Sequence, residues 1–326
     1  MKYAKGIARA EVPARAGLVG NPSDAFGGAI VGISVDDLTA TVVAEPSLTV
    51  ALEADGVSRE FEGIAALAAS SERPRSGPIA LLWAAVKRYA VERPARADSR
   101  FRLSLESSTI PPGVGLAGSS AIVIAALRAL GELHGDEIAD RDLPSVALAA
   151  ERNELGITAG LGDRVVQTYG GLVYLDLARD GGPRVEPLDA GRLPELFVAW
   201  RPDAQTHSGD VHGEMRARFA AGEPEVVAAM REIAGLARAA LKPLLTGDSG
   251  GLGILMERNL ELRGSIYDLD ERHTEIADAA RDLGAAVNFT GSGGAIVGLI
   301  RDEDQLSKLR ETLGGLGCEL VVRRRG

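Results

Sequence analysis

Three glycines and two serines between Pro112 and Ala121 form a pattern that could bind phosphate. The segment reads Pro-Gly-Val-Gly-Leu-Ala-Gly-Ser-Ser-Ala and leads directly into the apolar run from Ile122 to Leu130, which predicts a buried helix. Glycines allow backbone N–H groups to converge on a ligand, and the positive end of the helix dipole would point to the same place. The pattern therefore favours a polyanion as ligand.

The glycine spacing from Gly113 to Gly118 matches that of the nucleotide-binding P-loop, but Ser119 stands where the P-loop has its lysine. A P-loop is therefore excluded. Backbone amides and hydroxyl groups would have to hold the phosphates, and Ser119 or Ser120 could give a magnesium ion an oxygen ligand. Taken alone, the segment also fits a serine N-cap on a buried helix.

Asp163 is the candidate carboxylate for transfer of a phosphoryl group to a hydroxyl. Such a reaction needs a carboxylate near the acceptor hydroxyl, positive charge on the transferred group and a metal ion that bridges the phosphates. Asp163 follows the glycine-rich turn from Gly156 to Gly162 and precedes the apolar stretch from Val165 to Tyr169, which predicts a position at a helix start. A structural N-cap aspartate is the alternative.

Read from Pro111 or Pro112 to Ala121, the glycine-rich segment resembles the P-x-x-x-G-L-x-S-S-x signature of the GHMP small-molecule kinases. This superfamily includes galactokinase, homoserine kinase, mevalonate kinase and phosphomevalonate kinase. Two further segments match family motifs in the expected order. Pro13 to Asp24 is similar to the first motif, P-[GA]-[RK]-x-x-L-x-G-E-H-x-D, and Thr290 to Ala295 is similar to the C-terminal T-G-x-G-G-x loop.

The resemblance implies an α+β fold of the two-domain GHMP kinase type. Residues 1–185 would form an N-terminal ribosomal-protein-S5-like β/α domain that binds ATP, and residues 186–326 a C-terminal ferredoxin-like α/β domain. The cofactors would be ATP and Mg²⁺. The residues expected to contact ATP are Pro112, Gly113, Val114, Gly115, Leu116, Ala117, Gly118, Ser119 and Ser120.

The family pattern also implies catalytic roles. Asp163 would be the catalytic aspartate, and Arg15 would lie beside it, where a permanent positive charge favours the ionised carboxylate and stabilises the transferred phosphoryl oxygens. Glu151 corresponds to the magnesium-binding glutamate and would share the ion with Ser120, with Glu154 as its rival. Whether Asp163 removes the proton or only orients the hydroxyl stays open, because a largely dissociative transfer needs little activation of the nucleophile.

The acceptor motif departs from the galactokinase pattern, in which E-H-x-D binds sugar hydroxyls. Asp24 keeps a carboxylate that suits two vicinal hydroxyls, whereas Asn21 replaces the glutamate and removes one negative charge, which favours an anionic sugar. Candidate substrate contacts are Asn21, Ser23, Asp24, Thr290 and Gly291.

Four segments are similar to the glucuronokinases, which phosphorylate D-glucuronate at its anomeric hydroxyl to give D-glucuronate 1-phosphate. They include Arg258 to Arg263 and Phe289 to Gly294. The acid group of this substrate needs a cation, and the sequence does not choose among Arg164, Arg258 and Arg263. Other readings stay open: a superfamily kinase for galactose, galacturonate, an arabinose-type sugar, homoserine or mevalonate, an ATP-dependent decarboxylase, or a silent nucleotide-binding protein.

Composition narrows the class of protein. A net charge of −10 and a pI near 5.1 argue against a nucleic-acid partner, because binding to phosphate backbones needs clustered basic residues. The single Cys318 excludes an internal disulfide framework and favours a reducing compartment. Residues 1–10 lack a continuous apolar run and no other apolar run is long enough for a membrane span, so we expect neither a leader nor a spanning helix. We expect a cytoplasmic monomer or homodimer that acts on a small-molecule sugar or sugar acid.

Hydrophobic periodicity predicts the elements that position these residues. We expect a β-rich start with two strands within Ala29 to Ala44, a helix from Pro78 to Tyr89, and a strand from Phe101 to Leu105 before the glycine-rich segment. Beyond Trp200 the pattern turns helical. Expected there are helices at 207–221, 224–241, 250–266 and 271–283, and strands at 285–289 and 295–300 that bracket the Thr290 loop. The turn Asp180-Gly-Gly-Pro183 supports a domain boundary near residue 185.

Overall fold

The computed structural model describes residues 6–70, 74, 76–178, 182–204, 208–291 and 293–324. Within this part, helices and strands are mixed along the chain, so the predicted α+β class is confirmed. The chain divides into two compact units. The first unit comprises Met1–Ala14, Leu38–Ile110 and Ala117–Thr168, and the second comprises Arg15–Asp37, Pro111–Leu116 and Tyr169–Gly326. A boundary near residue 185 stays a prediction, and residues 180 and 181 of its turn lie outside the described residues.

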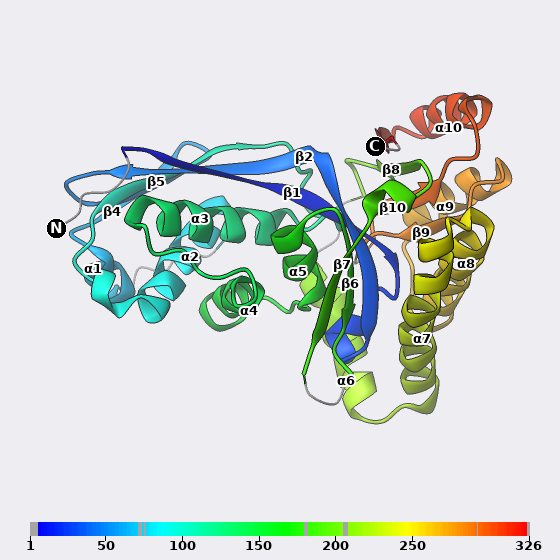
Figure 1. Ribbon diagram of the computed structural model, residues 1–326, viewed down its shortest axis with the longest axis horizontal. Helices are drawn as coiled ribbons and strands as arrows, with labels where there is room; N and C mark the ends of the chain where they lie inside the picture. The colour runs from blue at the N-terminus through cyan, green and yellow to red at the C-terminus, as the bar shows by residue number, and fades with distance from the viewer. Residues whose placement is uncertain are drawn as a thin grey trace. The chain divides into compact units, whose positions relative to one another are not determined.

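The first unit is built on a sheet with two helices packed against it. The strand order is β4, β3, β5 and then the second half of β2; β3 and β5 run parallel and the other neighbours antiparallel. Helices α2 (Pro78–Glu92) and α3 (Gly118–His134) pack on each other and on strands of this sheet (Figure 1). The strands are β2 (Ala29–Pro46), β3 (Val50–Ala54), β4 (Val57–Phe61) and β5 (Phe101–Ser108).

The buried side chains in the core of this unit explain where its helices form. Trp83 and Tyr89 of α2 are buried, and α3 buries nearly every side chain from Ala121 to Leu130. The long apolar run after the glycine-rich segment is thus a central helix whose start is fixed by packing. The helical elements are α1 (Ile64–Ala69), α2 (Pro78–Glu92), η2 (Pro94–Arg96), α3 (Gly118–His134), α4 (Leu143–Ala149), the π-helical turn η3 (Ala150–Glu154) and α5 (Gly162–Tyr169).

The second unit contains strands of both sheets. The first half of β2 pairs with β6, and β6 pairs with β7, all antiparallel. A separate antiparallel sheet has the strand order β11, β8, β10 and β9. Its central strands are fully buried, as their apolar sequences require. The strands are β6 (Leu172–Asp176), β7 (Arg184–Leu188), β8 (Leu196–Trp200), β9 (Val287–Phe289), β10 (Ala295–Leu299) and β11 (Glu319–Arg323).

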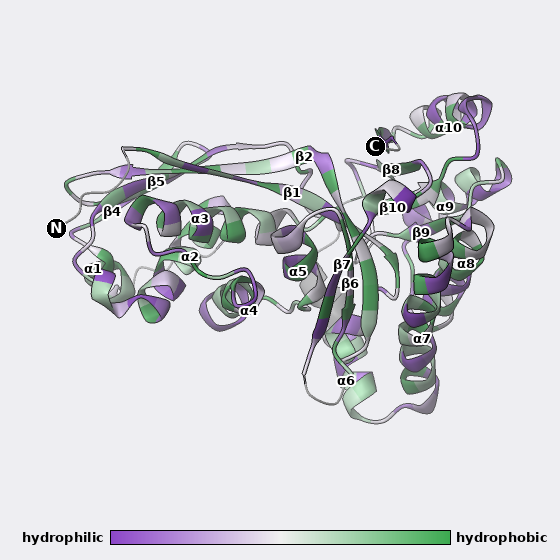
Figure 2. Cartoon of the chain, viewed as in Figure 1, coloured by the Kyte–Doolittle hydropathy of each residue, from purple (hydrophilic) through white to green (hydrophobic). Residues whose placement is uncertain are grey.

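Long helices dominate the rest of the second unit. Helix α7 (Pro224–Thr246) is amphipathic and packs on α8 (Ser249–Ile266), whose buried face carries polar as well as apolar side chains. Figure 2 shows both hydrophobic and hydrophilic residues along the two helices. Side chains of Asp248, Asp270 and Asp302 accept hydrogen bonds from backbone N–H groups of α8, α9 and α10 and fix where these helices begin. The elements are η1 (Ser23–Phe26), η4 (Ala190–Arg192), α6 (Ser208–Ala220), α7 (Pro224–Thr246), α8 (Ser249–Ile266), α9 (Glu271–Asp282) and α10 (Glu303–Gly315). Of the helices described, none is long and apolar enough for a membrane span.

Strand β1 (Ala8–Val19) is the main element that periodicity did not predict. Alanine occupies many of its buried positions, and Pro13 and Gly17 are poor strand residues, so the alternation gives a weak signal. Within the described part of the chain, β1 pairs with β2 alone, and an edge position tolerates the missing N–H of Pro13. β2 is one continuous strand and not the expected two, because Asp36 and Asp37 stay extended and exposed in its middle.

Asp176 connects β6 to α7 within the second unit. Its carboxylate accepts bonds from Arg238 Nε at 2.8 Å and Nη2 at 2.9 Å, and from the Tyr174 hydroxyl at 3.0 Å. The hydrogen bond from Arg238 lowers the pKa of Asp176 to about 2. The pKa of Asp176 in the folded protein lies below its ordinary value of 3.8, so the stabilisation is complete above pH 3.8 and disappears as the pH falls toward 2.

We therefore expect Asp176→Asn to lower the free energy of unfolding by about 1–3 kcal/mol at pH 7, since the variant leaves Arg238 without its counter-ion. The gap in melting temperature between wild type and variant should narrow as the pH is lowered from 5 toward 2. Thermal melts across this range check the expectation. A gap that stays constant with pH would show that the charge of Asp176 contributes nothing.

Candidate active site

The glycine-rich segment turns sharply before α3. Gly113 and Gly115 have φ values of 72° and 80°, and Ala117, which is not a glycine, also lies in the left-handed region with φ 62°. A left-handed alanine costs about 1 kcal/mol, so the surrounding structure must hold it there. The turn brings the chain to the first residue of α3 at Gly118, where backbone N–H groups and the helix dipole suit an anion.

Gln167 fixes this turn from within the first unit. Its side-chain amide donates to the carbonyls of Ala117 at 2.9 Å and Pro13 at 3.0 Å, and its Oε1 accepts from the Ser120 hydroxyl at 2.6 Å. The Ser120 hydroxyl also lies 3.1 Å from the Ala117 carbonyl, and Ser120 is fully buried. Ser120 and Gln167 together stabilise the start of α3.

Two carboxylates lie around one buried arginine in the first unit. Glu151, on the π-helical turn η3 and fully buried, accepts from the Ser119 hydroxyl at 3.0 Å with Oε1 and from Arg164 Nε at 2.7 Å with Oε2. Arg164 Nη1 reaches the Gly160 carbonyl at 2.9 Å and Asp163 Oδ2 at 3.3 Å. A single guanidinium thus bridges the two carboxylates and fixes the spacing between them.

Asp163 lies at the start of a helix, as its sequence context predicts. It lies in the first turn of α5, and its side chain keeps 26% of its surface exposed, whereas Glu151 keeps none. Asp163 is thus the more accessible of the two carboxylates. Glu154, the rival of Glu151, forms an ion pair with Lys87 at 3.0 Å.

The oxygen atoms beside α3 suit a magnesium ion. The Glu151 carboxylate and the Ser119 hydroxyl are hard oxygen donors, and magnesium in phosphoryl-transfer sites is held by one or two carboxylates while phosphates and water complete its shell. The donor set therefore fits Mg²⁺. The structure pairs Glu151 with Ser119, and it directs the hydroxyl of Ser120 to Gln167.

Three motif segments meet in the second unit. Arg15 Nη1 donates to the carbonyls of Thr290 at 2.5 Å and Gly115 at 3.1 Å, and the Thr290 hydroxyl donates to the same Gly115 carbonyl at 3.0 Å. The backbone N–H of Arg15 also reaches the Leu116 carbonyl at 3.2 Å. A Cβ on Gly291 would collide with the Gly115 carbonyl. Glycine is therefore required at 291, and Thr290 and Arg15 hold the glycine-rich segment in place.

The candidate acceptor residues divide into two kinds. The Asn21 amide donates to the carbonyls of Phe289 at 3.0 Å and Gly291 at 3.3 Å, and the Ser23 hydroxyl donates to the Ala29 carbonyl at 2.9 Å. Both side chains therefore form hydrogen bonds with backbone carbonyls of this chain. Asp24, in the first turn of η1, is only partly buried. Ser292 lies outside the described residues.

Sequence reasoning missed Asn259, which supports the acceptor motif from α8. Its Oδ1 accepts from the Gly20 N–H at 2.6 Å, and its Nδ2 donates to the Asn21 carbonyl at 3.0 Å. A signal was present: Leu252, Met256 and Asn259 follow helical spacing on one buried face, where a polar residue is unusual unless it has partners.

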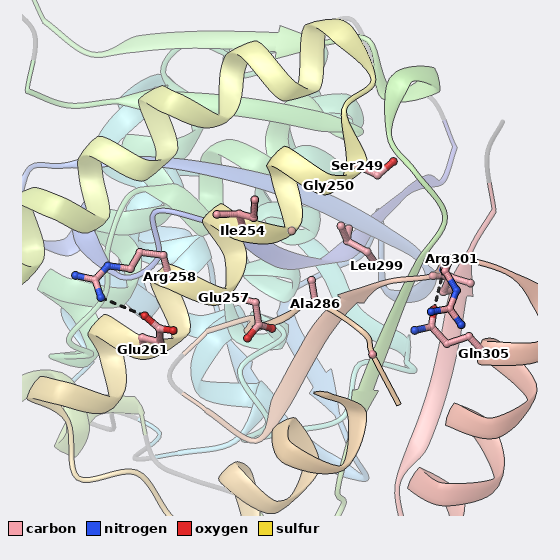
Figure 3. Close-up of a pocket in the computed structure, with 13 residues that line it drawn as sticks. Ser249, Gly250, Ile254, Glu257, Arg258, Glu261, Ala286, Leu299, Arg301 and Gln305 are labelled. Carbon is pink, nitrogen blue, oxygen red and sulfur yellow. Dashed lines mark hydrogen bonds and ion pairs between the residues drawn. The ribbon is translucent and has the colours of Figure 1, made fainter. Parts of the chain in front are cut away.

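Arg258, in contrast, lies at a different cavity of the second unit. This cavity has a volume of about 740 Å³ and is lined by residues of α8, α10 and the strands between them. Figure 3 shows Arg258 bonded to Glu261, at 3.1 Å, and Arg258 Nε also reaches Glu232 at 2.7 Å. Arg258 is therefore a surface ion-pair residue.

Comparison with known proteins identifies relatives of this chain. The family models of the N-terminal and C-terminal domains of GHMP kinases match residues 80–171 and 218–316. Glucuronokinase 1 of Arabidopsis thaliana is 34% identical over 87% of this chain and 82% of its own length, and probable glucuronokinase 2 of the same plant is 35% identical over 87% and 82%.

Solved structures of other proteins resemble the fold of this chain. The crystal structure of Lactococcus lactis galactokinase complexed with galactose superposes with a TM-score of 0.79 at 18% identity, over 98% of this chain and 94% of that one. The two-domain α+β fold is thus the one predicted. With both family models matched in order over more than half of its length, the chain belongs to the GHMP kinases.

Proposed function

We propose that the protein transfers the γ-phosphoryl group of Mg²⁺-bound ATP to the anomeric hydroxyl of D-glucuronate and releases D-glucuronate 1-phosphate. The observation that carries this proposal is the 34–35% identity to two glucuronokinases across 87% of the chain. The acceptor motif supports it, because Asn21 replaces an acidic residue and lowers the negative charge near an anionic sugar.

The segment from Pro112 to Ser120 would bind the phosphate donor, ATP. The left-handed turn and the start of α3 offer backbone N–H groups to the phosphates. Glu151 and a serine of the pair Ser119 and Ser120 would hold the magnesium ion, which when bound neutralises charge that develops on the phosphate oxygens. The contact at 3.0 Å favours Ser119 as the partner of Glu151.

Asp163 is proposed to bind and orient the acceptor hydroxyl. Its carboxylate is partly exposed and is oriented by Arg164, so it can accept a hydrogen bond from the sugar hydroxyl and keep that oxygen directed at the γ-phosphorus. Arg15 is proposed to add positive charge near the transferred group while it holds Gly115 and Thr290. Asp24 is proposed to bind sugar hydroxyls, and Asn21, Ser23, Thr290 and Gly291 to shape the loops around it.

A coupled assay of ADP release tests the acceptor. Across uronic acids, neutral sugars, homoserine and mevalonate, we expect the highest kcat/KM for D-glucuronate, and ³¹P NMR should detect a phosphate on C1. A clear preference for another acceptor would contradict the proposal, and release of CO₂ would favour a decarboxylase.

Replacement of Asp163 by asparagine tests its role. Since the amide keeps the shape but loses the charge, kcat should fall by about 10²–10⁴-fold while the affinity for nucleotide stays nearly constant. Steady-state kinetics and calorimetric titration with ATP measure the two quantities. Wild-type turnover in this variant would remove Asp163 from the mechanism.

The magnesium ligand can be assigned with two alanine variants. Because Ser119 contacts Glu151, we expect Ser119→Ala to raise the Mg²⁺ concentration for half-maximal activity severalfold. Ser120→Ala should mainly lower the melting temperature, since it removes the bond to Gln167. Glu154→Gln is the control, because Glu154 pairs with Lys87. A larger shift in Mg²⁺ dependence for Ser120→Ala than for Ser119→Ala would instead make Ser120 the ligand.

A further inference from the structure

Arg263 is a buried cation without a counter-ion in the part of the chain that the structure describes. It lies on the inner face of α8, one turn after Asn259, and exposes 1% of its surface. Among the described residues, its Nη1 donates to the Phe289 carbonyl, at 3.4 Å, and its buried Nε finds no hydrogen-bond partner. A permanent charge removed from water in this way is costly unless an anion accompanies it.

The surroundings of Arg263 do not supply such an anion. Its guanidinium carbon lies 5.2 Å from the ring centre of Phe289 and 5.8 Å from that of Tyr267, and aromatic faces compensate only part of the lost hydration. Burial lowers the pKa of Arg263 to about 10, and the positive charge of Arg15 acts in the same direction. The position therefore favours an incoming negative charge.

A second orphaned polar group lies next to this arginine. Tyr267 is 8% exposed, and its hydroxyl is buried with no hydrogen-bond partner among the described residues. Tyr267 follows Arg263 by one helical turn. An arginine and a tyrosine hydroxyl together match the acceptor atoms of a carboxylate.

Both groups lie beside the acceptor motif. The Phe289 carbonyl that accepts from Arg263 also accepts from the Asn21 amide at 3.0 Å. Asn259, on the same face of α8, holds the backbone of Gly20 and Asn21. Burial raises the pKa of Tyr267 to about 12, and the negative charge of Asp24 acts in the same direction.

The other candidate arginines are already engaged. Arg164 forms its ion pair with Glu151, and Arg258 pairs with Glu232 and Glu261 at the cavity of Figure 3. Arg15 donates to the carbonyls of Gly115 and Thr290.

We propose that Arg263, assisted by the hydroxyl of Tyr267, binds the carboxylate of the acceptor and thereby selects a sugar acid over the neutral sugar. This assignment rests on the proposed kinase function and adds the residue that determines its specificity. A carboxylate in this position would satisfy the Nε of Arg263 and the hydroxyl of Tyr267 together.

The test compares D-glucuronate with D-glucuronamide, which has the same hydroxyls but no charge. The measured quantity is the ratio of their kcat/KM values, which does not depend on the fraction of folded enzyme. In Arg263→Gln the ratio should fall by about 10²-fold or more, and Arg263→Lys should restore part of it. Tyr267→Phe should lower it severalfold. The control Arg258→Gln changes an exposed arginine of the same helix and should leave the ratio unchanged.

The outcomes separate the two proposals. If wild type prefers glucuronate and Arg263→Gln keeps the wild-type ratio, the role of Arg263 is overturned and the kinase proposal stands. If wild type phosphorylates another acid, the glucuronate proposal fails, and the same ratio, measured with that acid and its amide, decides on Arg263. If wild type accepts only uncharged acceptors, or phosphorylates none, both proposals are overturned.

Discussion

In the second unit, the candidate site depends on the carbonyl of Gly115. It accepts hydrogen bonds from the Thr290 hydroxyl and from Arg15, which are supplied by two distant parts of the chain. Gly291 must lack a side chain because this carbonyl occupies the space where a Cβ would lie. The glycine-rich segment therefore has its shape imposed by tertiary contacts, in addition to its own glycines.

Buried polar side chains position the rest of the site. Gln167 and Asn259 satisfy backbone groups of the motifs, and Arg164 joins Glu151 to Asp163. Satisfied networks of this kind contribute more to a unique geometry than to stability, because desolvation offsets much of their attraction. Arg263 differs from all of them, since its Nε has no partner within the described structure.

The sequence predicted the helices and most strands because their apolar periodicity is strong. The prediction of secondary structure failed where the local preference of the residues and their tertiary contacts disagree. β1 is rich in alanine and contains a proline and a glycine, and its pairing with β2 makes it a strand. For the candidate site, the start of α5 at Asp163 was predictable from its glycine-rich turn. The proposed preference for Ser119 over Ser120, and for Arg263 over Arg164 and Arg258, could not be predicted, because each rests on partners far away in the chain.

The central claim is that the glycine-rich segment before α3 holds the triphosphate while the acid group of the acceptor lies at Arg263. A crystal structure with Mg²⁺, a non-hydrolysable ATP analogue and D-glucuronate tests it most directly. The account predicts phosphate oxygens on the backbone amides from Gly113 to Ser120 and the sugar carboxylate within hydrogen-bond distance of Arg263. A triphosphate bound away from that segment, or a sugar whose carboxylate points to solvent, would contradict it.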